Sequence, residues 1–333
     1  MIIMLYGILS SKLAASTIII IAAVVACVAT FVLYIKPFKF LPRDKGKVVT
    51  TPDGQTVSIN IQSAGKVTGA GYVFVSVFLI TSLLFLPFGV EHGTYYVLMA
   101  IMMLIGFMDD GAKAPWGELV KGILDLALAT IAAIVFVYFN GSVVRFFNLE
   151  FKIPTVIYVI LAVCLIWGSI NVTNCSDGVD GLCGGVTVVE LVTFFLIFRG
   201  AKDIAGFSDY CGMTIILAAV LIAYLFYNWF PSKILMGDAG SRTIGFFIAL
   251  TAMKSGHPFI FVPLSFVFLC DGGLGLLKLA LMRTILKGHE VFGNIRFPLH
   301  DELRKNRGWK VPAVSAFFIA CEVVICVITY IVM

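Results

Sequence analysis

One polar segment of the chain combines residue types and spacing that suit phosphate chemistry. It reads NVTNCSDGVDGL over 171–182, so an amide or a carboxylate recurs at every third position, at Asn171, Asn174, Asp177 and Asp180. Side chains with this spacing lie along one face of a helical turn. Their oxygen atoms suit Mg²⁺, which takes one or two protein oxygens together with substrate phosphates. The segment therefore predicts a magnesium and phosphate site, with a plain polar loop as the alternative.

Two adjacent carboxylates form a second candidate site. Asp109 and Asp110 stand where an apolar stretch ends, and Lys113 follows them. Neighbouring carboxylates repel each other, so one of the two can be kept basic enough to take up a proton. The pair predicts a general base beside a cation site. The alternative is a helix end at the membrane interface with a lysine that reaches toward the lipid headgroups.

Two further segments carry charges that suit a phosphate group. Asp238 lies in the run LMGDAGS over 235–241, directly before an apolar stretch. Backbone amides at a helix start favour phosphate, and the aspartate can hold a metal on that phosphate. His300 lies in a basic loop with Arg304 and Arg307, a set suited to contact an anionic substrate. The alternatives are a glycine-rich loop for Asp238 and a loop that only sets topology for His300.

The composition places these residues in a membrane protein. Of the 333 residues, 60% are hydrophobic and 13% are charged, which excludes soluble and disordered chains. The apolar stretches are continuous rather than alternating, which excludes a transmembrane β-barrel. The eight cysteines form no Cys-x-x-Cys pair, so neither a zinc site nor a disulfide framework is indicated, and a formal charge of +5 is too small to indicate nucleic acid. We predict one all-α integral membrane domain over 1–333.

Ten stretches are apolar enough to be expected as transmembrane helices. They cover 17–35, 70–88, a short span at 94–108, 122–139, 154–170, 184–198, 211–230, 242–256, 258–282 and 312–332. Seventeen Lys and Arg side chains follow odd-numbered spans and six lie in the remaining connections, so the positive-inside rule places both termini outside. The predicted cytoplasmic loops are 36–69, with a short hairpin over 48–57, and 109–121, 171–183, 231–241 and 283–311.

Under this topology the candidate residues meet at one membrane face. Each polar cluster follows an odd-numbered span, which places Asp109, Asp238 and His300 on the cytoplasmic side. A secondary transporter, the distant alternative, would keep its ionisable residues near the membrane midplane. Other ionisable residues lie within the spans, where we expect them mainly to pair helices. They are Asp125, Glu190, Asp271, Lys278 and Glu322.

At these residues the sequence resembles the polyprenyl-phosphate N-acetylhexosamine-1-phosphate transferases. The resemblance spans nearly the whole chain and rests on DDxxK at 109–113, NxxNxxDGxDGL at 171–182 and MGDxGS at 236–241. It implies a Mg²⁺-dependent, multi-pass enzyme of the bacterial cytoplasmic membrane. Such an enzyme joins a sugar-1-phosphate from a UDP-sugar to undecaprenyl phosphate and releases UMP. The resemblance also suggests a homodimer.

The resemblance further implies roles for individual residues. Asp109 and Asp110 match the catalytic aspartates, and Asp177, which lies close to the expected Mg²⁺ ligand Asn174, is also assigned to catalysis. Asn174 and Asp238 match the Mg²⁺ ligands. His300 is assigned to catalysis as well. The residues expected to bind the uridine and phosphates of the donor are Lys113, Lys121, Asn171, Gly178, Val179, Asp180, Asn228 and Leu235.

Two donors are compatible with the resemblance. The Asn-x-x-Asn spacing and the Gly308-Trp309 end of the His300 loop favour UDP-N-acetylmuramoyl-pentapeptide, which would make the product lipid I of peptidoglycan synthesis. The branch of the family that uses this donor usually has three consecutive histidines, whereas Asp301 and Glu302 follow His300 here. UDP-N-acetylglucosamine is therefore the alternative donor. We expect the two acids to pair with the basic side chains that follow them on a helix.

The expected reaction is attack of the lipid phosphate on the β-phosphate of the UDP-sugar. We expect Asp109 to deprotonate the lipid phosphate. A two-step route through a covalent aspartyl intermediate is the alternative.

Overall fold

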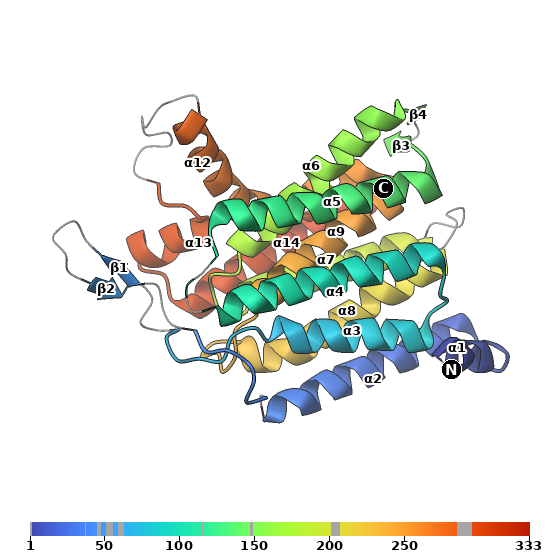
Figure 1. Cartoon of the computed structure of the whole chain (residues 1–333), viewed down its shortest axis with the longest axis horizontal. Coiled ribbons are helices and arrows are strands. Elements are labelled where there is room, and N and C mark those ends of the chain that lie inside the picture. Colours follow the sequence, from blue (N-terminus) through green and yellow to red (C-terminus); the bar gives the residue numbers. More distant parts are fainter. Residues whose placement is uncertain are drawn as a thin grey trace.

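The computed structural model describes residues 2–36, 38–44, 48–50, 56–58, 63–112, 114, 116–146, 149–200, 207–284 and 295–333, and these form a bundle of helices (Figure 1). The helices are α1 (Ile2–Ser10), α2 (Ala15–Ile35), α3 (Gly71–Phe85), α4 (Val90–Gly111), α5 (Glu118–Asn140), α6 (Thr155–Cys175), α7 (Leu182–Gly200), α8 (Phe207–Asn228), α9 (Asp238–Lys254), η1 (Pro258–Ile260), α10 (Phe261–Leu264), α11 (Phe266–Phe268), η2 (Leu269–Gly273), α12 (Leu274–Thr284), α13 (Leu299–Asp301), η3 (Glu302–Asn306) and α14 (Val311–Val332).

The helices confirm the prediction of an all-α membrane protein. Seven of them are long and apolar enough to cross a membrane, or eight if the bent run after α9 counts as one span, within the described residues. All ten predicted spans are helical, but α3 and α9 have only 15 and 17 residues, so ten full spans stay a prediction. The expectation of a short third span was wrong. α4 has 22 residues, because its helix continues through polar residues at both ends.

α9 is the central helix of the bundle. All of its residues from Ala239 to Lys254 are buried, and it packs against α3, α4 and α6. Glycines allow these close approaches: a Cβ at Gly71 would overlap the backbone of Gly240, and a Cβ at Gly106 would overlap that of Asp238. Small residues at helix contacts are the usual means of close packing in membranes. The first residue of α9, Asp238, is thereby held against α4.

The predicted span over 258–282 is broken in the structure. Its two halves, Pro258–Leu264 and Phe266–Met282, meet at an angle of 66°. Pro263 supplies no backbone N–H for the helix ladder, and Ser265 at the break has non-helical dihedral angles (φ −108°, ψ 22°). The hydroxyl of Ser265 donates to the buried Glu190 carboxylate of α7 over 2.5 Å.

The described residues also form two short β-hairpins. The predicted hairpin of the first long loop is confirmed, since β1 (Val48–Thr50) pairs antiparallel with β2 (Thr56–Ser58). A second antiparallel pair, β3 (Val143–Phe146) and β4 (Leu149–Lys152), was not predicted. Apolar and charged residues alternate along β4, which is the signal that could have found it.

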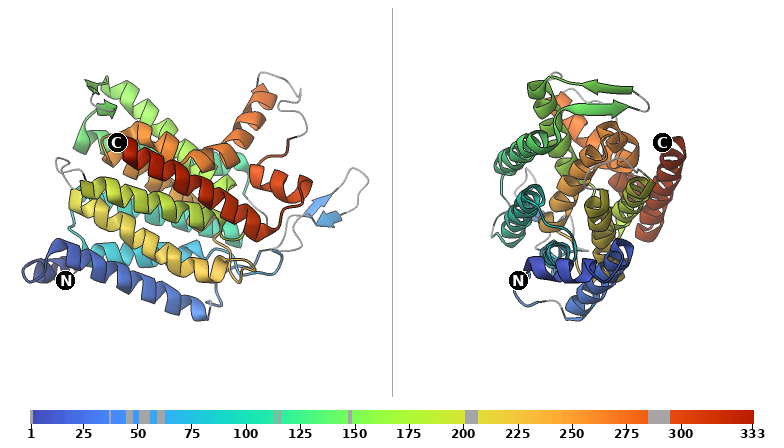
Figure 2. Two further views of the ribbon diagram at one scale, coloured as in Figure 1. Left: turned by 180° about the vertical axis from the view of Figure 1, so that it is seen from behind. Right: turned by 90° about the vertical axis from the view of Figure 1, so that its right-hand side faces the viewer.

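The two ends of the bundle differ. α13 and the β1–β2 hairpin lie at one end, and both chain termini lie at the other (Figures 1 and 2). The termini therefore share one side, as an even number of crossings requires.

Candidate active site

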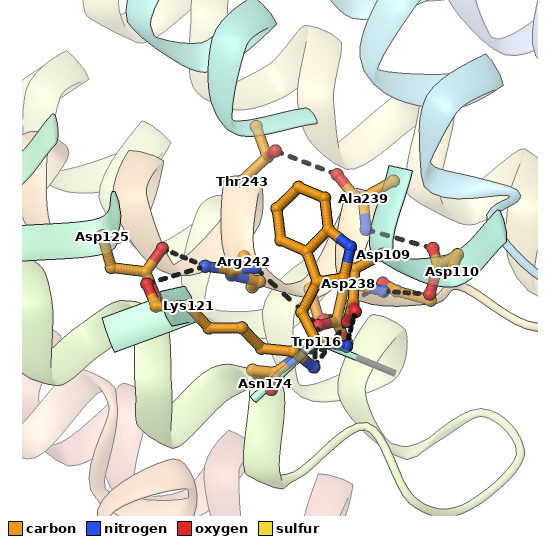
Figure 3. A network of polar contacts seen from close by, with 12 residues as sticks. Asp109, Asp110, Trp116, Lys121, Asp125, Asn174, Asp238, Ala239, Arg242 and Thr243 are labelled. Carbon is orange, nitrogen blue, oxygen red and sulfur yellow. Dashed lines mark hydrogen bonds and ion pairs between the residues drawn. The ribbon is translucent and has the colours of Figure 1, made fainter. Parts of the chain in front are cut away.

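A lysine ammonium group joins two of the predicted site carboxylates. Lys121 of α5 places its Nζ 2.5 Å from Oδ2 of Asp109 and 3.1 Å from Oδ2 of Asp238. Asp109 lies in the last turn of α4 and Asp238 begins α9, so three helices meet at this point (Figure 3). The backbone N–H of Trp116 donates to the other oxygen of Asp109 over 2.7 Å. The structure thus brings together residues from distant parts of the chain.

The other carboxylate oxygen of Asp238, Oδ1, has a partner of its own. The amide nitrogen of Asn174, at the end of α6, donates to Asp238 Oδ1 over 2.9 Å and to the hydroxyl of Ser241 over 3.0 Å. Burial by itself raises the pKa of Asp238, but Lys121 and Asn174 outweigh it and hold this pKa below its usual value. Asp238 is therefore kept ionised, the state that a cation requires.

Two other predicted carboxylates bind the backbone around Asp238. The N–H of Asp238 donates to Asp110 Oδ1 over 3.1 Å, and that of Gly237 donates to Asp177. Gly237 has φ +71°, and a Cβ there would overlap the Asp110 carboxylate, so only glycine fits. Burial, together with the neighbouring charge of Asp238, raises the pKa of Asp177 to about 7. Asp110 and Asp177 thus hold the segment that carries Asp238.

A buried ion pair lies next to Asp238, and this contact was not predicted from the sequence. Arg242, one turn after Asp238 on α9, pairs with Asp125 of α5, and both side chains are 2% exposed. Arg242 Nη1 lies 3.8 Å from Asp238 Oδ2 and has no hydrogen-bond acceptor among the described residues. Asp125 was expected only to pair helices. An arginine one turn into a buried helix was the signal for this contact, because such a charge needs a partner.

The residues predicted for the uridine pocket lie in adjoining loops. Asn228 accepts the N–H of Gly181 over 2.9 Å and donates to the carbonyl of Ile234. Asp180 accepts the N–H of Ser232 over 3.0 Å and lies 3.7 Å from the ammonium of Lys66.

The remaining members of this pocket lie beside them. Leu235 donates its backbone N–H to the carbonyl of Val67 over 2.8 Å, which joins the connection after α8 to the segment before α3. Val179 is 6% exposed, and Gly178 lies beside it. The structure therefore gathers Gly178, Val179, Asp180, Asn228 and Leu235.

His300 lies against the same loop. A Cβ on Gly178 would overlap the imidazole Nε2 of His300, and Arg304 donates to the carbonyl of Gly178 over 3.2 Å. The acids that follow His300 pair as expected: Asp301 lies 2.6 Å from Lys305, and Glu302 lies 3.1 Å from Arg307.

A polar cleft adjoins the carboxylates. The empty volume of this cleft, including the part open to solvent, is about 250 Å³. Asn171 lines it and donates to the carbonyl of Trp167 over 2.8 Å. The other lining residues are Glu118, Lys121, Asp125, Ile170, Asn174 and Arg242. The remaining predicted residue, Lys113, lies outside the described residues.

The chemistry of the donor set fits Mg²⁺. Asp109, Asp238 and Asn174 offer carboxylate and amide oxygens, the ligands of this ion. The ammonium group between Asp109 and Asp238 shows that the two carboxylates can share one cation. No group of three His, Cys, Asp or Glu side chains in the described part of the chain forms a metal site by itself. The ion would therefore depend on Asn174 and on substrate phosphates.

Comparison with known proteins gives consistent matches. The family model described as glycosyl transferase family 4 matches residues 93–256. The chain is 36% identical over 302 residues to a phospho-N-acetylmuramoyl-pentapeptide-transferase of Treponema pallidum (strain Nichols), covering 86% of this chain and 81% of that protein. Proteins of the same name from Caldanaerobacter subterraneus subsp. tengcongensis and Streptococcus agalactiae serotype Ia are 28% and 25% identical, covering 84% and 93% of this chain and 85% and 97% of those proteins.

Proposed function

Because this chain belongs to the phospho-N-acetylmuramoyl-pentapeptide-transferase family, we propose that it transfers phospho-N-acetylmuramoyl-pentapeptide from its UDP donor to undecaprenyl phosphate. The products are lipid I and UMP. The observation that carries the proposal is the junction of Asp109, Lys121, Asn174 and Asp238, which provides oxygen ligands and a positive charge at one point. A diphosphate donor needs both.

The reaction exchanges one phosphoanhydride for another. Asp109 takes the proton of the lipid phosphate, whose oxygen then attacks the β-phosphorus of the donor. The bond from this phosphorus to the oxygen bridging it to the α-phosphate breaks, and UMP leaves with that oxygen. Asp109 is 8% exposed, and Lys121 and the amide of Trp116 hold its carboxylate in place.

The other residues bind and orient the donor. Lys121 and Arg242 supply positive charge beside Asp238, and Asn228 and Asp180 shape the loops of the proposed uridine pocket. Asp238 and Asn174 would hold Mg²⁺, which neutralises charge on the diphosphate when it is bound. His300 would contact the donor.

The charges of the His300 loop are compatible with the pentapeptide donor. Asp301 and Glu302 would repel a diphosphate if they were free, but both pair with basic residues of their own loop. The departure from three histidines therefore adds little negative charge at the site. UDP-N-acetylglucosamine remains the alternative donor to be compared.

We further infer that this end of the bundle faces the cytoplasm. The support is the excess of Lys and Arg in the connections at this end. The chain would then act in the bacterial cytoplasmic membrane, where both the lipid carrier and the nucleotide donor are accessible. A homodimer stays a prediction from the family resemblance.

The decisive assay measures UMP released by the purified protein with undecaprenyl phosphate and Mg²⁺. We expect UDP-N-acetylmuramoyl-pentapeptide to turn over much faster than UDP-N-acetylglucosamine. The opposite ranking would contradict the proposed donor, and no release from either would contradict the proposed reaction. Stoichiometric UMP release with donor alone would favour the two-step route over direct attack.

A further inference from the structure

A buried aspartate outside the predicted site holds His300 by two contacts. The backbone N–H of His300 donates to Asp271 Oδ1 over 2.7 Å, and its ring Nδ1 lies 2.8 Å from Asp271 Oδ2. The side chains of His300 and Asp271 are 4% and 0% exposed. An ionised carboxylate only accepts hydrogen bonds, so the ring carries a proton on Nδ1 and its Nε2 points away from Asp271.

The fold brings Asp271 to this place through a local distortion of the broken span. Asp271 lies in η2, a π-helical turn between α11 and α12. A Cβ at the next residue, Gly272, would lie only 2.5 Å from the carbonyl oxygen of Val172 in α6. η2 therefore packs closely against the end of α6, beside the loop that starts at Ser176. π-helical turns of this kind are often found at functional sites.

The free end of the imidazole faces the candidate active site. Nε2 lies over Gly178, where it leaves no room for a Cβ. The neighbouring Asp177 accepts the N–H of Gly237, and Asp238 follows directly. Asp271 thus contacts His300, and His300 contacts Gly178. The neighbour of Gly178, Asp177, in turn contacts the segment that carries Asp238.

We propose that Asp271 is a positioning residue that fixes the orientation and tautomer of His300 and so presents an unprotonated Nε2 as a hydrogen-bond acceptor to a hydroxyl or N–H group of the donor. The part that concerns the donor rests on the proposed function. A carboxylate buried in a membrane span is costly unless it is paired, and the two hydrogen bonds to His300 supply that pairing. The arrangement resembles the partners that orient histidines in other sites by binding the second ring nitrogen.

The variant Asp271→Asn separates positioning from packing. Asparagine has nearly the same shape and keeps one oxygen for the backbone N–H of His300. Its amide group then offers hydrogen to Nδ1, which favours the tautomer with the proton on Nε2. The ring stays in place, but its Nε2 then carries the proton and no longer accepts a hydrogen bond from the donor. The matched control is Cys270→Ala, at the preceding residue of η2, which leaves the Asp271 carboxylate unchanged.

Nitrogen-15 NMR of the histidine rings reads this tautomer without any donor. The chain has only four histidines, and the variant His300→Ala identifies the signal of His300. We expect a proton on Nδ1 in the wild type and in Cys270→Ala, and a shift toward the Nε2–H form in Asp271→Asn. A wild-type ring with its proton on Nε2 alone, or no change in Asp271→Asn, would overturn the proposal.

A double-mutant cycle in the UMP-release assay tests whether Asp271 acts through His300. We expect His300→Ala to lower kcat about 100-fold and Asp271→Asn about 10-fold or more, with little change in KM for the donor. In the His300→Ala background, Asp271→Asn should cost less than about 2-fold, because the group it positions is gone.

Equal costs of Asp271→Asn in both backgrounds would show a purely structural role and overturn the proposal. Absence of UMP release from the wild type would instead contradict the proposed function, while the NMR result would still decide the contact between Asp271 and His300. The two failures are therefore distinguishable.

Discussion

At the scale of single residues, the carboxylates of the site divide into two groups by what they contact. Asp109 and Asp238 face a side-chain cation, Lys121. Asp110 and Asp177 accept backbone N–H groups from the segment that carries Asp238. The family resemblance groups Asp110 and Asp177 with Asp109 as catalytic, whereas the contacts group Asp109 with Asp238 and Asp110 with Asp177. Each group predicts a different response to substitution.

Asp238→Asn should abolish most of the turnover. It removes the charge that attracts Lys121 and that would hold Mg²⁺ on the donor, so we expect kcat to fall about 1000-fold. UMP release at saturating Mg²⁺ measures this loss. Yield and melting temperature should change little, because asparagine keeps the shape of the aspartate side chain. Near wild-type turnover would show that Asp238 is no metal ligand.

Asp177 should make stability depend on pH. Its folded-state pKa of about 7 lies above the value of an exposed aspartate, so the unfolded chain loses this proton at lower pH than the folded chain does. The free energy of unfolding should therefore fall as pH rises from about 4 to 7 and level off above that. Melting curves in EDTA should show this slope, and Asp177→Asn should flatten it. An unchanged slope in the variant would assign it to another group.

At the scale of elements, α9 holds the site together through its contacts with α4 and α5. Gly106 lets α4 touch the start of α9, and the pair of Arg242 with Asp125 fixes α5 beside it. These contacts place the ammonium group of Lys121 between Asp109 and Asp238. The geometry of the site thus depends on helix packing at positions that carry no chemistry themselves.

Gly106→Ala should disturb both packing and activity. The added methyl group would overlap the backbone of Asp238 and Ala239, so α4 and α9 must move apart. We expect the melting temperature to fall and UMP release to drop at least about 10-fold. Gly122→Ala on α5 is the matched control, because nothing lies within 4 Å of its Cβ. It should keep activity and raise stability by about 0.5–1 kcal/mol. Equal behaviour of the two variants would contradict this account.

At the scale of the whole molecule, the candidate active site and the two chain termini lie at opposite ends of the bundle (Figure 2). The β3–β4 hairpin lies at the same end as the termini (Figure 1). Its Arg145 is bonded to Glu150 over 2.9 Å, whereas Lys305 of the His300 loop lies at the site end. The membrane orientation proposed above therefore assigns these two side chains to opposite aqueous compartments.

Cysteine labelling in intact cells tests this orientation. A cysteine at Arg145 should react with an impermeant thiol reagent added outside, and a cysteine at Lys305 should react only after the cells are opened. Wild-type protein controls for labelling of the native cysteines. Labelling of both positions from outside, or a reversed pattern, would contradict the assignment of the active site to the cytoplasm.

The sequence alone determined the membrane class and the positions of the long helices, and it proposed the members of the site. Apolar runs and the short motifs that contain Asp109, Asn174 and Asp238 are local properties, so they can be read without a fold. Only the tertiary structure decided the pairing of Arg242 with Asp125, the contacts of Asp271 with His300 and the break at Ser265. These contacts join distant segments, and they depend on how closely glycines let the helices approach.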